Sequence, residues 1–290
     1  FGPDDDMIVA VGGADPGLWD ARLAACGVAP SFREPVVGRL AGLVRWVDYP
    51  RDEAQARVAI AQAGAHLAEG DVGAVLFEPV LGRGGVVVPP AGFLDELCAL
   101  ARSHGALCIA DEIWTGMGRA GHVLSSRALT EPVDLLCVGK GLGGSFPVSG
   151  CVGSGAVMQA WAQGGKVVHT STHAGAPFAA AAARATLRAV RDQGLAARAA
   201  NLGAELCATL RAALGSSVAV RGAGLMIGVE LAGSAMPVHH ALLARGYLTT
   251  VGGPAGNVLV LTPPLVIERE LALGVVAPLA EILAGARSTR

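Results

Sequence analysis

Two patterns of apolar residues alternate along the first half of the chain. Short, nearly continuous apolar runs are typical of buried strands, whereas apolar residues that recur every three or four positions predict amphipathic helices. The runs predict strands at Met7–Val11, Gly73–Phe77, Ala106–Ala110 and Asp134–Val138. The helical spacing covers Asp52–Glu69 and Ala91–His104. This alternation predicts an α/β fold with a mainly parallel central sheet and helices on both of its faces.

The second half of the chain has a different character. Long helices are predicted at Pro177–Arg191 and Leu195–Leu214, and shorter ones at His239–Arg245 and Glu268–Ala286. Strands are predicted at Val218–Arg221, Leu225–Leu231 and Val258–Leu261. We therefore expect a large domain over residues 1–190 and a smaller C-terminal α+β domain over residues 191–290.

Composition narrows the functional class. The 290 residues are 52% hydrophobic and 16% charged, with a formal net charge of −2. This balance excludes a charged disordered chain and gives no broad electrostatic footprint for nucleic acid. No run of about 20 apolar residues predicts a membrane span. The six cysteines are scattered without a Cys-x-x-Cys pair, which favours free buried thiols in a reducing cytoplasm over a metal site or a disulfide framework.

Two acidic residues follow the third predicted strand. Asp111 and Glu112 stand where that strand ends, and ligands of open α/β sheets bind outside the carboxyl ends of the strands. A carboxylate buried there is costly unless it meets a polar or positive partner. A simple turn or helix-capping role for Asp111 is the alternative.

One lysine stands out against the other basic residues. All but two of the 22 basic residues are arginine, and the two lysines are Lys140 and Lys166. Lys140 lies between Gly139 and Gly141, directly after the strand ending at Val138. A desolvated lysine can act as an amine nucleophile, whereas arginine stays charged. With only two lysines, chance placement is the alternative.

A strand-end carboxylate and a glycine-flanked lysine suit one known cofactor chemistry. Pyridoxal phosphate needs a lysine for its Schiff base and a carboxylate on its pyridinium nitrogen, which keeps the ring an electron sink. It also needs a cradle of N–H groups and hydroxyls around its phosphate. Asp111 and Lys140 are therefore candidates for the first two of these roles.

Several motifs, in order, resemble those of the class III (ornithine aminotransferase-like) pyridoxal-phosphate aminotransferases of fold type I. They are Phe77-Glu78-Pro79, Val87–Leu94, Asp111–Arg119, Gly139–Gly144, His169–Pro177, Arg221–Leu231 and Pro263–Ile267. The resemblance runs from Val72 to about Leu231, with the last motif beyond it.

The resemblance implies a role for each matching residue. Lys140 corresponds to the Schiff-base lysine that also shuttles a proton, and Asp111 to the partner of the pyridinium nitrogen. Glu112 resembles the glutamate that supports the cofactor region, and Ile113 the apolar residue against one ring face. Thr172 is expected to reach the phosphate bound by a neighbouring subunit, which implies a homodimer with shared active sites.

The sequence departs from the family pattern near the expected cofactor. Gly13 falls in the turn that is expected to border the ring, but the family's aromatic-histidine pair is replaced there by Asp15-Pro16. Trp114 takes the place of a frequent glutamine, so we expect it to shape the cofactor and substrate pocket. No stretch resembles the family's N-terminal part, so we expect a missing natural beginning or a second polypeptide that supplies it.

Two further departures concern the substrate. The ornithine-type enzymes pair a loop glutamate with an arginine that grips the α-carboxylate. The corresponding residues here are Arg83 and Val260. Either Arg83 supplies the positive charge from the opposite wall, or the amine substrate lacks an α-carboxylate; a solvated loop arginine is the third possibility. Glu78 resembles a structural glutamate near the site, and simple packing explains it equally well.

The function that these residues indicate is transamination. Through a Lys140 Schiff base, an amino group would pass between an amine or amino acid and a keto acid or aldehyde. An aminomutase or amino-acid epimerase of the same family is the alternative, because Lys140 and Asp111 would serve either reaction. A catalytically weakened relative is a third hypothesis. We expect a cytoplasmic, bacterial protein with no metal, nucleic-acid or membrane partner.

Overall fold

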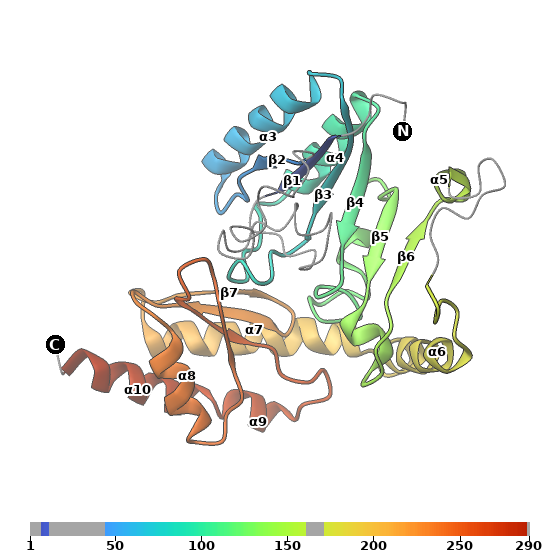
Figure 1. The fold of residues 1–290 in the computed structure, drawn as a ribbon. Helices are drawn as coiled ribbons and strands as arrows, with labels where there is room; N and C mark the ends of the chain where they lie inside the picture. The colour runs from blue at the N-terminus through green and yellow to red at the C-terminus, as the bar shows by residue number, and fades with distance from the viewer. Residues whose placement is uncertain (1–6, 12–43, 161–170, 289–290) are drawn as a thin grey trace.

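The larger of two sheets forms the first part of the molecule. The computed structural model describes residues 7–11, 44–160 and 171–288 (Figure 1). The sheet consists of β1 (Met7–Val11), β2 (Val44–Val47), β3 (Val72–Phe77), β4 (Leu107–Asp111), β5 (Leu135–Val138) and β6 (Gly150–Gly153). Their order is β2-β1-β3-β4-β5-β6, and every pairing is parallel except that of β5 with β6. The predicted mainly parallel sheet is confirmed; β2 and β6 were not predicted.

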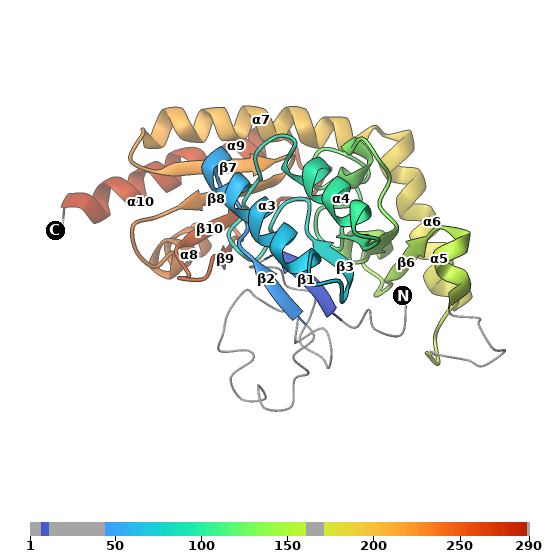
Figure 2. The same cartoon turned by 90° about the horizontal axis from the view of Figure 1, so that it is seen from above.

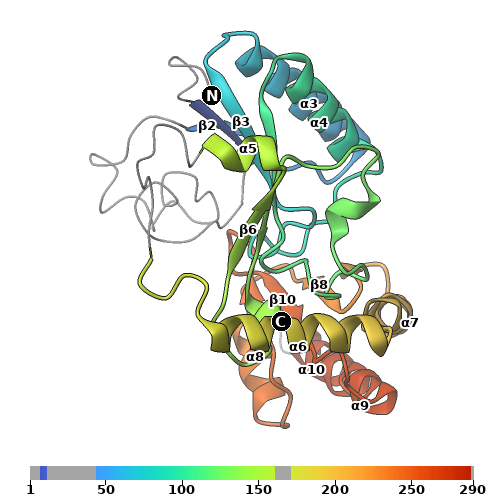
Figure 3. The same ribbon diagram turned by 90° about the vertical axis from the view of Figure 1, so that its right-hand side faces the viewer.

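Two helices cover one face of this sheet. They are α3 (Glu53–Leu67) and α4 (Phe93–Ser103), which lie side by side in Figure 3. α3 begins where the Asp52 carboxylate accepts a hydrogen bond from the backbone N–H of Gln55 at 2.8 Å. α4 buries Phe93, Leu94 and Leu97 in the core that also holds the apolar residues of β1, β3 and β4. The apolar spacing seen in the sequence therefore marks the faces that pack on the sheet.

The second part of the molecule contains a smaller antiparallel sheet. It consists of β7 (Ala219–Ala223), β8 (Met226–Glu230), β9 (Thr250–Gly252) and β10 (Val258–Leu261), in the order β7-β8-β10-β9. α5 (Gly155–Gln159) follows β6 of the large sheet, and α6 (Pro177–Asp192) leads from there to the second part. The helices of the second part are α7 (Leu195–Leu214), α8 (Met236–Leu243), α9 (Arg269–Leu273) and α10 (Val276–Ser288). Figure 2 shows α7 lying along the small sheet, and α7 packs on β7. Among the described residues, no helix is long and apolar enough to cross a membrane.

The predicted helix over Glu268–Ala286 was wrong, because the structure divides this segment into α9 and α10. A continuous helix would need residue 278 to donate to the carbonyl of Gly274, and Pro278 has no N–H. The hydroxyl of Tyr247 donates to that carbonyl instead, at 2.9 Å. The proline that ends the helical ladder was therefore visible in the sequence.

Glycine-rich turns hold the two sheets together. A Cβ at position 203 on α7 would lie 1.8 Å from the carbonyl oxygen of Gly224, so the helix and the β7–β8 turn can touch only because Gly203 has no side chain. Next to that turn, the N–H of Leu225 donates to the carbonyl of Arg119 at 2.9 Å. The small sheet is thereby fixed beside the segment that follows β4. The domain boundary at residue 190 stays a prediction.

Candidate functional site at the carboxyl edge of the large sheet

Neighbouring strands bring Asp111 and Lys140 to one edge of the large sheet. Asp111 is the last residue of β4 and lies opposite Cys137 of β5. Lys140 follows β5 by two residues and opens a short 3₁₀ helix, η3 (Lys140–Gly143). The sequence interpretation placed each residue after its own strand, and the structure brings both to the edge where α/β folds bind ligands.

Asp111 is buried, with 7% of its surface exposed. One of its carboxylate oxygens accepts a hydrogen bond from the N–H of Ile113 at 3.0 Å, which is the turn interaction that the sequence left open. That bond fixes how the chain leaves β4. Burial at a strand end combined with a fixed orientation is also what a carboxylate needs in order to hold a cationic ring nitrogen.

Glu112 is even more deeply buried, at 1% exposed, and both of its carboxylate oxygens are engaged. One accepts from the N–H of Ser125 at 2.7 Å and from the hydroxyl of Thr115 at 3.1 Å. The other accepts from the N–H and the hydroxyl of Ser126, at 2.7 and 2.6 Å. Glu112 therefore anchors the loop at η2 (Ser125–Ala128), and its contacts support a structural role beside Asp111.

Lys140 has an unusual backbone conformation. Its φ angle is +41°, in the left-handed region that costs a non-glycine residue of this kind about 1 kcal/mol or more. Its side chain borders an open hollow of about 1010 Å³, together with Phe146, Val148, Ser149 and His173. Strained residues of this kind cluster at functional sites, because the surrounding fold must hold them in place.

Trp114 lies beside the lysine amine. The Lys140 Nζ lies 4.6 Å from the centre of a Trp114 ring, within the range of a cation–π interaction. On the other side of the lysine, a Cβ at position 139 would lie 3.5 Å from the side chain of Ile113. Ile113 therefore contributes apolar surface beside Gly139, and Trp114 contributes it beside Lys140.

The remaining predicted residues are not brought to the hollow around Lys140. Arg83 is exposed on the loop after β3, where its carbonyl accepts from the N–H of Gly253 at 2.8 Å. Glu78 is buried and accepts from the N–H of Gly82 at 2.9 Å, which supports a packing role. Thr172 is exposed, between two residues that line the hollow. Gly13, with Asp15-Pro16, lies outside the described residues.

The sequence interpretation missed Cys137 as a neighbour of the site. Burial, followed by the effects of the Cys151 thiol and the Asp111 carboxylate, raises the pKa of Cys137 to about 12, so it stays a neutral thiol. Cys151 lies opposite Cys137 on β6 and is exposed, which contradicts the expectation of uniformly buried thiols; Cys98, Cys108 and Cys207 are buried and free. Only the strand register reveals this neighbour. Within the described residues, no cluster of three metal-ligating side chains occurs.

Two residues that line the hollow were also missed as individuals. Ser149 follows the glycine loop after Lys140, and His173 lies in the motif that precedes α6. The signal for His173 was its place inside a recognised motif, but nothing in its spacing pointed towards Lys140.

Comparison with known proteins adds the evolutionary context. The chain matches the family described as "Aminotransferase class-III" over residues 8–283. It is 37% identical over 219 residues to an acetylornithine aminotransferase of Methanothermobacter thermautotrophicus, covering 71% of this chain and 55% of that protein. It is 39% identical over 215 residues to an ornithine aminotransferase of Bordetella pertussis, covering 73% and 51%. The chain thus spans about half the length of these curated relatives.

A solved structure shows the same fold. An ornithine aminotransferase of Toxoplasma gondii, described with partial occupancy of pyridoxal phosphate at its active site, superposes with a TM-score of 0.87 at 29% identity. The match covers 100% of this chain and 66% of that one. The arrangement of two sheets described above is therefore the arrangement of a pyridoxal-phosphate transaminase.

Proposed function

Because this chain belongs to the class III aminotransferase family, we propose that it takes part in moving an amino group from an amine or amino acid to a keto acid or aldehyde. The single observation that carries the proposal is the placement of Asp111 at the end of β4 and of Lys140 just after the neighbouring strand β5, at one sheet edge. The names of the relatives suggest donors such as ornithine and its acetylated form.

The residues at this edge fit pyridoxal phosphate, the cofactor of the family. Asp111 is a buried carboxylate suited to a protonated ring nitrogen, and Lys140 offers an amine at a hollow of about 1010 Å³. Ile113 and Trp114 supply apolar surface for a flat ring. When bound, the cofactor supplies an electron sink that weakens the bonds to the carbon bearing the amine. From the sequence resemblance, we also propose that Gly13 contributes to cofactor binding.

Three residues of the chain have distinct roles in this proposed reaction. The carboxylate of Asp111, oriented by the N–H of Ile113, would hold a proton on the ring nitrogen of the bound cofactor. The amine of Lys140 takes the proton from the donor carbon and returns it on the acceptor side, as a general base and then a general acid. Glu112 holds the η2 loop and with it the turn that positions Asp111.

We also propose that the catalytic unit is a homodimer. Thr172 is exposed and lies next to the hollow but does not line it. This placement supports the expectation that its hydroxyl serves the phosphate held by a second subunit. The large hollow beside Lys140, open at the surface, supports the same assembly. A cytoplasmic location remains a proposal from the sequence.

The test is cofactor binding by the full chain. Incubation with pyridoxal phosphate should give an absorbance band near the visible edge, and borohydride should fix the cofactor to the peptide that contains Lys140. Lys140→Ala should abolish both signals. Lys166→Arg is the matched control, because it removes the only other lysine and should leave both signals unchanged. A dimer that stays colourless would overturn the proposal.

The reaction type has its own test. A transaminase consumes a keto acid or aldehyde in proportion to the amine, so turnover of a single amine should stop when the acceptor is withheld. Continued turnover without an acceptor would identify an aminomutase or epimerase instead. Both measurements use the same loaded protein, so they separate these outcomes directly.

A further inference from the structure

Three departures from the family pattern meet in one place in the fold. Trp114, Val260 and the loop that carries Arg83 are far apart in sequence. In the structure, Trp114 packs against the cluster that contains Val260, and the residue before Arg83 touches the Trp114 ring. These positions therefore belong to one rearranged cluster, in which Trp114 is the residue that lies beside Lys140.

Gly82 makes room for the Trp114 ring. A Cβ at position 82 would lie 2.3 Å and 2.9 Å from two carbons of that ring, far inside van der Waals contact. The N–H of Gly82 donates to the buried Glu78 carboxylate at 2.9 Å, which holds the loop against the ring. The Trp114 ring therefore contacts the backbone of Gly82. The Lys140 Nζ lies over the same side chain, 4.6 Å from the ring centre.

An apolar cluster from the loop after β3, the segment after β4 and the small sheet supports the Trp114 ring. Its buried members are Val80, Val86, Ala120, Met226, Val258 and Val260. Each is at most 6% exposed. Val260 itself is 1% exposed, so the position where an ornithine-type enzyme would carry a cation is a fully packed aliphatic side chain. The Trp114 ring therefore packs against buried, uncharged side chains.

The two arginines near this cluster bind to the protein itself. The guanidinium of Arg119 donates to the carbonyls of Leu225 and Pro263, at 2.9 and 2.5 Å. The guanidinium of Arg221 donates to Gly85 and Val86 carbonyls and to Glu230. These hydrogen bonds hold both groups in the framework of the loop and the small sheet. What Trp114 presents to Lys140 is the face of its ring.

We propose that Trp114 is a positioning residue for Lys140, and that its ring is the wall against which the non-reacting group of the amine donor lies. Its face holds the lysine ammonium before the cofactor binds. The same face favours a donor with an alkyl or aryl group at that position over one with a carboxylate, because an anion on an aromatic face meets the negative side of the ring quadrupole. The part concerning the donor rests on the proposed function, whereas the part concerning Lys140 does not.

The first experiment measures the lysine without the cofactor. An amine-modifying reagent is applied to the folded full chain, and mass spectrometry gives the ratio of modified Lys140 to modified Lys166 within one molecule. Trp114→Leu removes the ring and should raise this ratio about two- to fivefold, the range of an exposed cation–π interaction. Trp114→Phe keeps an aromatic face and should stay near the wild-type ratio.

Gly82→Ala tests the same contact without altering the tryptophan. Its methyl group would displace the ring, so the ratio should rise as it does in Trp114→Leu. The matched controls are Trp46→Leu on β2 and Gly233→Ala, where a Cβ would meet nothing within 4 Å. Both should leave the ratio unchanged. An unchanged ratio in Trp114→Leu and in Gly82→Ala would overturn the positioning role.

The second experiment concerns the donor and uses the loaded enzyme. It compares kcat/KM for an arylalkyl amine with kcat/KM for the α-amino acid that has the same side chain. The wild-type protein should prefer the amine at least tenfold, and Trp114→Arg should reverse the preference. A wild-type preference for the amino acid that Arg83→Ala abolishes would overturn the wall and identify Arg83 as the carboxylate clamp. If no donor reacts, the proposed function fails, while the labelling result still decides the role of Trp114.

Discussion

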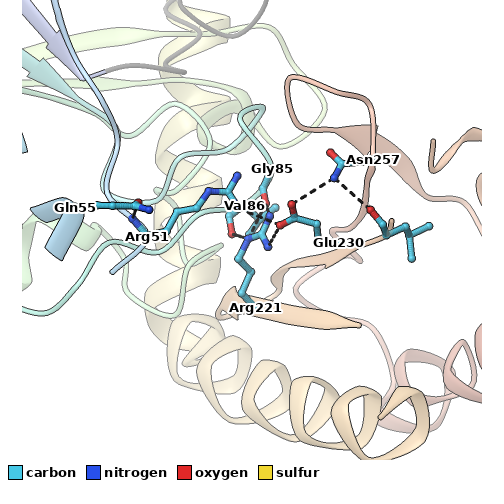
Figure 4. A network of polar contacts seen from close by, with 8 residues as sticks. Arg51, Gln55, Gly85, Val86, Arg221, Glu230 and Asn257 are labelled. Carbon is cyan, nitrogen blue, oxygen red and sulfur yellow. Dashed lines mark hydrogen bonds and ion pairs between the residues drawn. The ribbon is translucent and has the colours of Figure 1, made fainter. Parts of the chain in front are cut away.

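Two glutamates anchor two regions of this molecule in different ways. Glu112, beside the lysine edge of the large sheet, accepts four hydrogen bonds, all from neutral backbone and hydroxyl groups of residues 115–126. Glu230, at the junction of the two sheets, accepts from the guanidinium groups of Arg221 and Arg51, at 2.5 and 3.0 Å, and from the amide of Asn257 at 3.3 Å (Figure 4). One carboxylate fixes a local loop, and the other joins distant segments.

The difference follows from burial. At 1% exposed, Glu112 gains most from donors that carry no competing charge and are already ordered by the turn around them. The side chain of Glu230 is 28% exposed, so water screens its ion pairs and each contributes less. Arg221 compensates by donating also to the carbonyls of Gly85 and Val86, which ties β7 to the loop after β3. Glu112 is thus a dry anchor, a carboxylate shielded from water beside the site. Glu230 joins the two sheets through ion pairs that are partly exposed to water.

The largest predicted effect is the loss of the dry anchor. Glu112→Ala leaves the N–H groups of Ser125 and Ser126 and two hydroxyls without their acceptor, so the free energy of unfolding should fall by about 3–5 kcal/mol. Urea unfolding measures it. Glu112→Gln keeps an acceptor and should lose less than Ala. Equal losses for the two variants would mean that the donors find water, and that the Glu112 site is not shielded from solvent.

Loss of the junction arginine should have a smaller effect. Arg221→Met keeps the aliphatic stem but removes the donors to Glu230 and to two backbone carbonyls, so we expect a loss of about 2 kcal/mol in urea unfolding. Arg51→Met is the matched control, because the side chain of that arginine is 43% exposed and its guanidinium pairs with the same carboxylate. It should cost less than about 1 kcal/mol. If the two variants lose the same stability, the carbonyl contacts of Arg221 contribute nothing.

The contribution of Glu230 to stability should depend on pH. Burial alone would raise the pKa of Glu230, but the hydrogen bonds and charges of Arg221 and Arg51 outweigh it and hold that pKa below its usual value of 4.5. Its contribution is therefore complete above pH 4.5 and is lost as the pH falls through the lowered value. The stability difference between the wild type and Glu230→Gln should shrink in that acidic range. A difference that stays constant down to pH 3 would contradict this prediction.

The smallest predicted effect is that of salt. Raising the ionic strength to about 1 M screens exposed ion pairs, so the loss caused by Arg51→Met should fall by a few tenths of a kcal/mol. The loss caused by Glu112→Gln should not change, because its partners are neutral and buried. Parallel urea titrations at low and high salt measure both. Equal salt dependence would show that the two anchors do not differ in solvent access.

Much of the fold was predictable because local signals agreed with the final packing. The limits of β1, α7 and β10 coincide with the apolar runs read from the sequence. The short strands β2, β6 and β9 were missed, because each has only three or four residues and takes its conformation from a neighbouring strand. The break between α9 and α10 was missed although Pro278 marked it.

The candidate site was predictable only in part. The motif order and the strand ends indicated Asp111 and Lys140, and the scarcity of lysine gave Lys140 independent support. The sequence could not show that Glu112 is committed to the η2 loop, because its donors lie up to fourteen residues away and are found only when the loop closes. Nor could it show that Cys137 lies beside Asp111, since that depends on the register of β4 and β5.

The sequence by itself therefore determined the α/β pattern, the family resemblance and the two residues that define the site, because strand ends and motifs are local in the chain. Only the tertiary structure decided that Gly82 and the cluster containing Val260 pack against Trp114, whose ring lies at the Lys140 amine. The physical reason is that the Trp114 ring can touch the backbone of Gly82 only when three distant segments come together. These are the loop after β3, the turn after β4 and the small sheet. Separations of this length along the chain carry no periodicity from which such an approach could be read.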